Sequence, residues 1–271
     1  MGTYVVSDIH GCYKEFLQLL GQIRFDHEHD ILVCAGDYID RGSQNVEMLN
    51  WIAHAPDHVI FLRGNHEEEY VTNIEMMQFV CQKYKLDKDS MEDTQILYQM
   101  VYRLTQQMGT SFFDYYGTIG KMINESGVTF AKLCEWADNI RQMPYVYRQM
   151  VNDRMCIVVH AGYIEDLETA DTEKRYGSVE EFYLYARDDA YMCGGIAHGM
   201  IIAGHTPTIL AEEFPYNAGE VYRMYDKETD CIFYDIDCGC AMSRRYAEAK
   251  LACIRLEDEK VFYVRRSEVD F

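Results

Sequence analysis

Five short apolar runs rich in β-branched residues recur along the chain, and each stops at a polar residue beside a glycine. Such runs predict buried strands, because a strand that is covered on both faces is apolar throughout. Apolar residues at helical spacing separate the first three runs, so the pattern predicts parallel βαβ units with right-handed crossovers. The two helices are expected at 16–23 and 46–52, with Ser43 as the N-cap of the second. The strands are expected at 4–6, 31–35, 59–62, 156–159 and 201–203.

Residues 68–143 follow a different pattern, in which apolar side chains recur every three or four positions. We expect a helical cap here, inserted between the third and fourth strands, with Met and aromatic side chains on its core side. Its predicted apolar faces consist of Ile74, Met77, Val80 and Cys81, then Ile96, Met100 and Leu104, then Phe130, Leu133 and Cys134.

Beyond residue 221 the pattern becomes antiparallel. Polar turns separate residues 222–225 from 231–237, and 251–256 from 261–264, which predicts two hairpins. The chain has no internal repeat and no Gly/Ser-rich or Pro-rich linker, so we expect a single domain over residues 1–271. The expected fold class is α/β, with either one mixed sheet or a sandwich of two sheets, flanked by helices.

The charge balance limits what the protein can bind. Among 271 residues, 45 are Asp or Glu and 25 are Lys or Arg, which gives a formal net charge of −20. Such a chain repels nucleic acid and anionic membranes, so neither is an expected partner. A phosphate-bearing substrate would therefore need local positive charge, from metal ions or from placed arginines.

The sequence also favours a cytoplasmic location. No window approaches the roughly 18 apolar residues of a membrane span, and the first residues read directly into a strand rather than a secretory signal. The ten cysteines are scattered without any C-x-x-C spacing. This pattern is typical of reduced, partly buried thiols in a cytoplasmic protein.

Metal-binding side chains stand directly after the five predicted strands. Each one alone is commonly a turn residue or a hydrogen-bonded histidine, but together their oxygen and imidazole donors predict a site for divalent cations. A central aspartate can bridge two metals, and two metals about 3.5–4 Å apart that share a hydroxide are suited to in-line displacement at phosphorus. The residues are Asp8, His10, Asp37, Asn65, His160 and His205.

The same segments resemble a known family. The blocks Asp8–Gly11, Gly36–Gly42, Gly64–Glu67, His160–Gly162 and Gly204–Thr206 resemble the signatures of the phosphoprotein phosphatase family of calcineurin-like metallophosphoesterases. The resemblance covers roughly residues 3–67 and 156–256. It points to the branch with bacterial and phage Ser/Thr phosphatases and symmetrical diadenosine tetraphosphate hydrolases. It implies a calcineurin-like sandwich of two mixed sheets flanked by helices.

The resemblance also implies a role for each site residue. Arg41 would grip phosphate oxygens, and Arg187 is the candidate for a second phosphate-binding arginine, the alternative being a surface ion pair with Asp188 or Asp189. His66 would donate a proton to the leaving group, oriented by Asp40. Asp8 and His10 would hold metal one, Asp37 would bridge, and Asn65, His160 and His205 would hold metal two.

We therefore expect a dimetal phosphoester hydrolase, with manganese or an iron- or zinc-containing pair, in which a bridging hydroxide attacks phosphorus in line. The first interpretation is a phosphomonoesterase of Ser/Thr protein phosphatase type, acting on a phosphorylated peptide or protein. The alternatives are a symmetrical dinucleoside polyphosphate hydrolase or another enzyme for a small phosphorylated metabolite, and a non-catalytic metal-bound regulator. Residues 163–200 do not match the substrate-contacting segments of eukaryotic Ser/Thr phosphatases, and Ser7 stands where many relatives have glycine.

Overall fold

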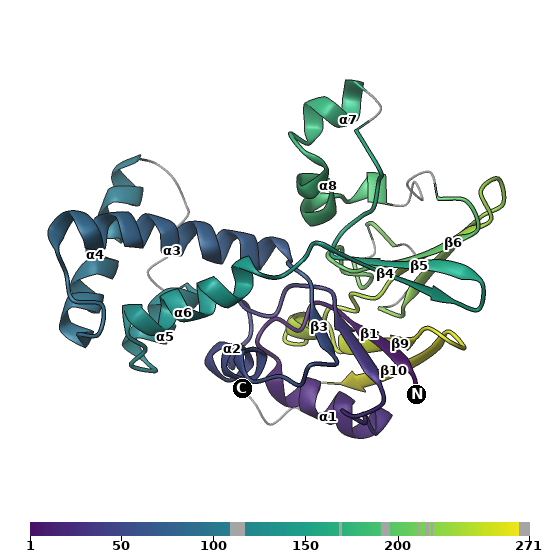
Figure 1. Cartoon of the computed structure of the whole chain (residues 1–271), viewed down its shortest axis with the longest axis horizontal. Coiled ribbons are helices and arrows are strands. Elements are labelled where there is room, and N and C mark those ends of the chain that lie inside the picture. Colours follow the sequence, from purple (N-terminus) through teal and green to yellow (C-terminus); the bar gives the residue numbers. More distant parts are fainter. Residues whose placement is uncertain are drawn as a thin grey trace.

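The computed structural model describes residues 1–108, 117–167, 170–190, 196–210, 212–214, 217 and 219–265. Two five-stranded mixed sheets lie face to face in it, with helices on their outer sides (Figure 1). The expected α/β sandwich of two mixed sheets with flanking helices is therefore confirmed.

The first sheet contains the predicted βαβ units. β1 pairs in parallel with β2, and β2 with β3, while β9 runs antiparallel beside β1. Helices α1 (Tyr13–Ile23) and α2 (Asn45–Ala53) connect the parallel strands. The sheet order is β10-β9-β1-β2-β3, with β1 (Thr3–Val6), β2 (Ile31–Cys34), β3 (Val59–Phe61), β9 (Lys250–Arg255) and β10 (Lys260–Arg265).

The second sheet holds the last two predicted parallel strands and one predicted hairpin. β6 lies between β5 and β8 and runs parallel to both, while β7 pairs antiparallel with β8. The sheet order is β4-β5-β6-β8-β7, with β4 (Val146–Val151), β5 (Arg154–Val159), β6 (Gly199–Ala203), β7 (Tyr222–Asp226) and β8 (Cys231–Asp235).

Strand β4 was not predicted from the sequence. It is an edge strand with polar residues such as Arg148 and Gln149, so it lacks the apolar run by which the other strands were found. The turn that joins it to β5 does carry a signal. Asn152 and Asp153 both adopt the left-handed conformation, as a two-residue hairpin turn requires.

Side chains alternate between two core layers along each strand. In β1, Val5 points between the sheets, where it meets Val158 and Ile202 of the second sheet. Its neighbours Tyr4 and Val6 face the helices on the outer side of the first sheet. A third cluster covers the outer face of the second sheet, packed against α8 (Val179–Tyr185). Each sheet is therefore covered by apolar side chains on both faces, and this packing holds the ends of the parallel strands in place.

Residues 65–141 supply four helices that pack on one another and extend to one side of the sheets (Figure 1). Their buried side chains belong to the same core cluster as those of α1 and α2. The helices are α3 (Asn65–Tyr84), α4 (Met91–Met108), α5 (Thr118–Asn124) and α6 (Phe130–Arg141), and α7 (Ala170–Arg175) lies further along the chain.

Two local predictions were wrong. The predicted apolar face of α4 is largely exposed at Ile96 and Leu104, and the helix instead buries the face that carries Leu97 and Val101. Thr94 and Thr105 lie on this buried face, where their hydroxyls donate to the backbone carbonyl oxygens of Ser90 and Tyr102. Because the buried face is partly polar, apolar spacing alone predicted the wrong side of the helix. At α2, the N-cap is Gln44 rather than the exposed Ser43.

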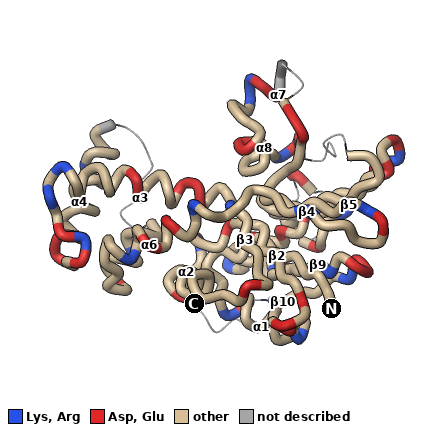
Figure 2. Tube along the Cα trace, in the orientation of Figure 1, with Lys and Arg blue, Asp and Glu red and all other residues tan. Residues whose placement is uncertain are grey.

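The described cysteines are free and buried, which agrees with reduced thiols; Cys193 lies outside the described residues. Acidic and basic positions are interspersed along the whole trace rather than segregated into one region (Figure 2). Within the described part of the chain, none of the helices has the length and apolarity needed to cross a bilayer.

The cluster between the sheets should dominate stability. Ile202→Ala removes a fully buried side chain from it, and we expect a loss of about 2–5 kcal/mol in the free energy of unfolding. Met150→Ala, at an exposed position of the same sheet, is the control and should change it by less than about 1 kcal/mol. Urea titration followed by circular dichroism measures both. Equal effects would show that the sheets do not share this core.

Candidate metal centre

The predicted ligands meet where the parallel strands of both sheets end. Asp8 and His10 follow β1, Asp37 follows β2, and Asn65 is the first residue of α3, shortly after β3. His160 follows β5 directly, and His205 stands two residues beyond β6. A sheet-to-sheet hydrogen bond joins the two groups, since His160 Nδ1 donates to the Ala35 carbonyl oxygen at 2.9 Å. The carboxyl ends of parallel strands thus form one site from two sheets.

The loops that carry these side chains contain residues with an unfavourable backbone conformation. Asp8, His10, Asp37 and His205 all adopt the left-handed conformation, with φ between 45° and 73°. Residues other than glycine avoid this region because Cβ crowds the following carbonyl, and the strain tends to concentrate at functional sites. The loops that follow the strands therefore turn sharply to aim four candidate ligands inward.

The loops also lack room for additional side-chain atoms. A Cβ at Gly64 would lie 2.4 Å from Asp37 Oδ1, and one at Gly204 would lie 2.1 Å from Asp8 Oδ2. Both contacts are far shorter than van der Waals distance, so glycine is required where the backbone passes these carboxylates. The signature glycines therefore exist to let the ligands approach one another.

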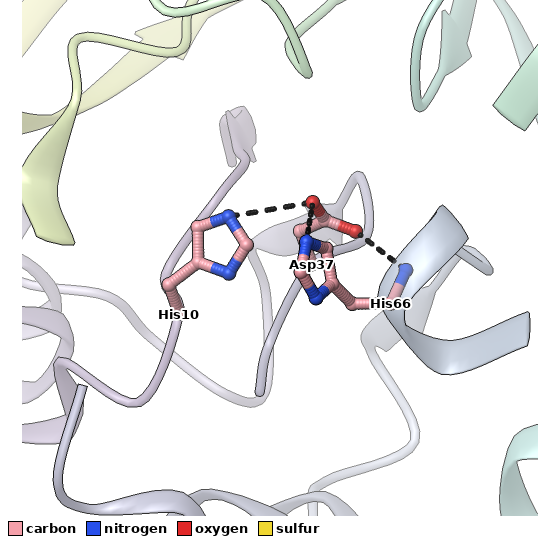
Figure 3. A group of neighbouring side chains, drawn as sticks. All are labelled: His10, Asp37 and His66. Atoms are coloured by element: carbon pink, nitrogen blue, oxygen red, sulfur yellow. Dashed lines mark hydrogen bonds and ion pairs between the residues drawn. The ribbon is translucent and has the colours of Figure 1, made fainter. Parts of the chain in front are cut away.

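One group of donors surrounds one oxygen of Asp37. His10 Nε2 lies 3.3 Å from Asp37 Oδ2, and His66 Nε2 lies 3.7 Å from the same oxygen (Figure 3). His10 Nδ1 must carry the ring proton, because it donates to the Ile39 carbonyl oxygen at 2.8 Å. Burial lowers the pKa of His10 to about 4, so its Nε2 presents a lone pair toward Asp37.

A second group surrounds the other oxygen of Asp37. His160 Nε2 lies 3.4 Å from Asp37 Oδ1 and 2.9 Å from Asn65 Oδ1. His205 Nδ1 lies 3.0 Å from Asn65 Oδ1 and 3.2 Å from His160 Nε2. Burial lowers the pKa of His205 to about 2, which leaves it neutral near pH 7. Asp37 is the residue that both groups share.

Asp8 is oriented beside the first group. Its Oδ2 accepts hydrogen bonds from Ser7 Oγ at 2.5 Å and from the His205 backbone N–H at 3.0 Å. Its Oδ1 is buried and has no hydrogen-bond partner, and the same holds for His10 Nε2, 3.9 Å away. A buried acceptor without a partner is costly, so these two atoms point to a missing positive ligand.

These donors fit a pair of divalent cations. Lone pairs of carboxylate, amide and imidazole groups converge in both groups, and acceptors that face one another repel unless a cation lies between them. The mixture of oxygen and nitrogen donors, with no thiolate among them, is the set that borderline divalent metals take. A shared aspartate with one oxygen in each group is the arrangement of a dinuclear site.

A histidine–carboxylate dyad borders the first group. His66 Nδ1 lies 2.6 Å from Asp40 Oδ2, and Arg41 Nη2 lies 3.2 Å from His66 Nε2. Burial by itself would lower the pKa of His66, but the hydrogen bond with Asp40 and the charge of Asp37 raise it to about 9. Protonated His66 and Arg41 are then two donors facing the same space, which suits an anionic oxygen between them.

Arg187 lies beside the second group, as the sequence suggested. Its Nη1 is 3.5 Å from Thr206 Oγ1, next to His205, and its charge helps to lower the pKa of His205, after burial and His160. Asp189, one of its two alternative partners, pairs with Arg175 at 2.6 Å instead. Arg187 is exposed and lies near the second group, on the His205 side of the site.

Two contributing residues were not assigned a role from the sequence. Glu67 is fully buried, and its carboxylate accepts the backbone N–H groups of Asp37, Tyr38 and Gly64 at 2.7–3.0 Å. Burial and the charge of Asp37 raise the pKa of Glu67 to about 8, against the effect of these donors. Ser7, which stands where many relatives have glycine, orients Asp8 through a hydrogen bond. The available signal was position, since Glu67 ends one signature block and Ser7 directly precedes another.

Known proteins resemble this chain in sequence and in fold. A segment of 67 residues is 40% identical to a symmetrical bis(5'-nucleosyl)-tetraphosphatase of Buchnera aphidicola subsp. Baizongia pistaciae. The matched segment is 25% of this chain, and it spans only about a quarter of that relative (24%).

Two solved structures share the fold over nearly the whole chain. A putative diadenosine tetraphosphatase matches 98% of this chain and 95% of its own, with a TM-score of 0.53 and 13% identity. A protein serine/threonine phosphatase from Saccharomyces cerevisiae, with similarity to human phosphatase PP5, matches 99% of this chain and 81% of its own. Its TM-score is 0.51 and its identity 14%, so both comparisons concern the fold alone.

The model of the calcineurin-like phosphoesterase family matches residues 1–208, which include all six candidate ligands and the histidine–carboxylate dyad. Because the match covers most of the chain, this protein belongs to the calcineurin-like phosphoesterases, hydrolases that act on phosphoester bonds at a site for two metals.

Proposed function

We propose that this protein is a dimetal phosphomonoesterase that removes phosphate from phosphorylated peptides or proteins. The observation that carries the proposal is the pair of donor groups that share Asp37, with the His66–Asp40 dyad directly beside them. Asp8, His10 and Asp37 would hold one cation, and Asp37, Asn65, His160 and His205 the other. Bound there, two divalent cations would supply Lewis acidity toward phosphate oxygens and an activated water for in-line displacement.

The chain's own side chains would position the phosphate. Arg41 lies beside His66 and Arg187 beside Thr206, and each guanidinium offers a planar fork for phosphate oxygens. They also supply positive charge in a chain whose net charge is −20. An incoming phosphate would therefore be attracted to this site despite the acidic remainder of the protein.

His66 would protonate the departing oxygen. Its Nδ1 is occupied by Asp40, so the ring is held in one orientation with Nε2 directed at the site. The raised pKa keeps the ring protonated near neutral pH, and the charge of Asp37 contributes to this. A held and protonated imidazole next to a leaving alkoxide is the arrangement that general acid catalysis requires.

Negative charge on α3 beside His66 favours a monoester substrate over a polyphosphate. Three consecutive carboxylates, Glu67, Glu68 and Glu69, occupy the first turn and a half of α3. Glu67 bonds to backbone N–H groups and Glu68 pairs with Arg63 at 2.9 Å, but Glu69 is exposed three residues after His66, on the same face of the helix. A substrate with a single phosphate meets less repulsion there than one with four.

A symmetrical dinucleoside polyphosphate hydrolase is the second candidate. The relatives that carry this name match a segment of 67 residues, a quarter of this chain. The metal groups would serve an anhydride as well as an ester. The match leaves three quarters of the chain without a counterpart in these relatives. The name of these relatives therefore supports this candidate less strongly than the charge argument supports the first.

Asp37→Asn tests the shared ligand. Removing the charge that serves both groups should lower the affinity for both cations by at least about tenfold. Elemental analysis after dialysis against limiting Mn²⁺ measures the metal content per chain. Asp57→Asn, at an exposed position, is the control and should match the wild type. Full occupancy in Asp37→Asn would refute the bridging role.

His66→Asn separates a proton donor from a metal ligand. We expect kcat for a phosphoserine peptide to fall about 10²- to 10⁴-fold, because general acid catalysis contributes this much, while the metal content stays near the wild-type value. Steady-state kinetics and elemental analysis on the same preparation provide both values. Lost metal would make His66 a ligand, and unchanged kcat would remove it from the mechanism.

Substrate choice is tested by comparing p-nitrophenyl phosphate, a phosphoserine peptide and diadenosine tetraphosphate in Mn²⁺, with a chelated sample as the control. We expect metal-dependent hydrolysis of the monoesters with a kcat/KM at least about tenfold above that for the dinucleotide, which corresponds to about 1.4 kcal/mol. Preferential conversion of the dinucleotide to two ADP would establish the second candidate instead. Two bound metals without turnover of any substrate would contradict both.

A further inference from the structure

A sixth parallel strand ends at the candidate metal centre, and none of the predicted ligands follows it. β8 runs parallel to β6 in the second sheet, with Ala203 opposite Asp235. The carboxyl end of β8 therefore lies at the same edge as the ends of β5 and β6, which are followed by His160 and His205. Asp237 stands two residues beyond β8, just as His205 stands two residues beyond β6.

The loop that carries His205 is hydrogen-bonded to Asp237. Thr208, at the end of this loop, donates its backbone N–H to the Asp237 carbonyl oxygen at 2.8 Å. The His205 backbone N–H donates to Asp8 Oδ2 at 3.0 Å. A Cβ at Gly204 would lie 2.1 Å from the same Asp8 oxygen, so the loop runs directly against that carboxylate. One short loop thus contacts both Asp8 and Asp237.

The carboxylate of Asp237 is buried, and only one of its oxygens is hydrogen-bonded. Oδ1 accepts the backbone N–H of Gly239 at 2.8 Å, whereas Oδ2 has no hydrogen-bond partner. Among the described residues, eight buried side-chain atoms lack such a partner, and three of them are acceptors that follow parallel strands at this edge: Asp8 Oδ1, His10 Nε2 and Asp237 Oδ2. Burial raises the pKa of Asp237, and the charge of Asp8 raises it further, which agrees with the closeness of the two carboxylates. A buried acceptor without a partner indicates a missing cation or donor.

The candidate ligands offset only part of the charge of two divalent cations. Two such cations carry four positive charges, and Asp8 and Asp37 are the only carboxylates among the six candidate ligands. Opposite charges attract strongly in a buried region, so a further carboxylate there favours cation binding. Asp237 brings such a charge to the end of the site where Asp8 stands.

We propose that Asp237 is a further residue of the first cation's site, whose free carboxylate oxygen strengthens binding of the cation that Asp8 and His10 would hold. The inference deepens the proposed function and rests on the two cations of that site. It concerns the affinity for one of them, so it can fail while the two-metal site stands.

The test measures Mn²⁺ affinity by equilibrium dialysis and elemental analysis over a series of Mn²⁺ concentrations. Asp237→Asn keeps the shape of the side chain and an oxygen for the Gly239 N–H, but removes the charge. We expect the affinity for the first cation to fall about tenfold and that for the second to change less than about twofold. Asp30→Asn is the matched control, because Asp30 is a buried carboxylate before β2, at the opposite end of the first sheet, and accepts the Gly2 N–H at 2.7 Å. It should bind Mn²⁺ like the wild type.

Two background variants assign the effect to one cation. In Asn65→Ala, which weakens the second site, the tightly bound Mn²⁺ is the first cation, and adding Asp237→Asn should lower its affinity about tenfold. In Asp8→Asn, which weakens the first site, adding Asp237→Asn should change the remaining affinity less than about twofold. An equal loss in both backgrounds, a loss in Asp8→Asn alone, or no loss in either would overturn the proposal.

Thermal unfolding separates this role from a structural one. Because the free oxygen is costly when no cation is bound, metal-free Asp237→Asn should be at least as stable as the metal-free wild type, and Mn²⁺ should raise its Tm less. A metal-free variant that unfolds at a clearly lower temperature would make Asp237 a structural residue. If the wild type binds fewer than two Mn²⁺, the proposed site fails and the inference fails with it. If two bind and Asp237→Asn leaves both affinities unchanged, the inference alone fails.

Discussion

A buried carboxylate surrounded by lone pairs is the constraint on which the rest of the structure depends. Asp37 is 1% exposed, and ring nitrogens of His10 and His160 lie against its two oxygens, with Asn65 Oδ1 next to His160. The ring protons of both histidines are committed to backbone carbonyls on the far side, so no proton is available to bridge these contacts. Without cations this cluster would be strongly unfavourable, and bound cations would offset that cost.

This constraint also explains how the two sheets are joined. One cation would take its ligands from loops of the first sheet, and the other would take Asn65 and Asp37 from the first sheet and two histidines from the second. The Ala35 carbonyl, which follows β2, accepts from His160, which follows β5, and the Asp8 carboxylate accepts from the His205 backbone. Metal binding and docking of the sheets would therefore be coupled, since each brings together the same loops.

The parallel strands and the place of the candidate site could be predicted from the sequence. Buried parallel strands are apolar throughout, and the candidate metal ligands follow the ends of these strands. The edge strand β4 was missed since half of its residues are polar, and the buried face of α4 was misplaced since Thr94 and Thr105 occupy it. The spacing of apolar residues predicts a buried face only where that face consists of apolar side chains. The convergence of the six candidate ligands was predictable because they stand in short blocks of unusual composition after the parallel strands.

Other contributions depend on contacts that no local pattern reveals. The hydroxyl of Ser7 donates to the carboxylate of Asp8, and the buried carboxylate of Glu67 accepts the backbone N–H of Asp37. Neither role can be recognised before these contacts are known. The substrate is equally remote from such patterns, because the surroundings of the site would select it rather than the candidate metal ligands.

The central claim is that two divalent cations share Asp37. Crystals grown in Mn²⁺ and measured at the manganese absorption edge test it most directly, because anomalous scattering locates each ion without reference to activity. The account predicts two anomalous peaks, one against each oxygen of Asp37, the first next to Asp8 and His10 and the second next to Asn65, His160 and His205. A single peak, or peaks that do not contact Asp37, would contradict it.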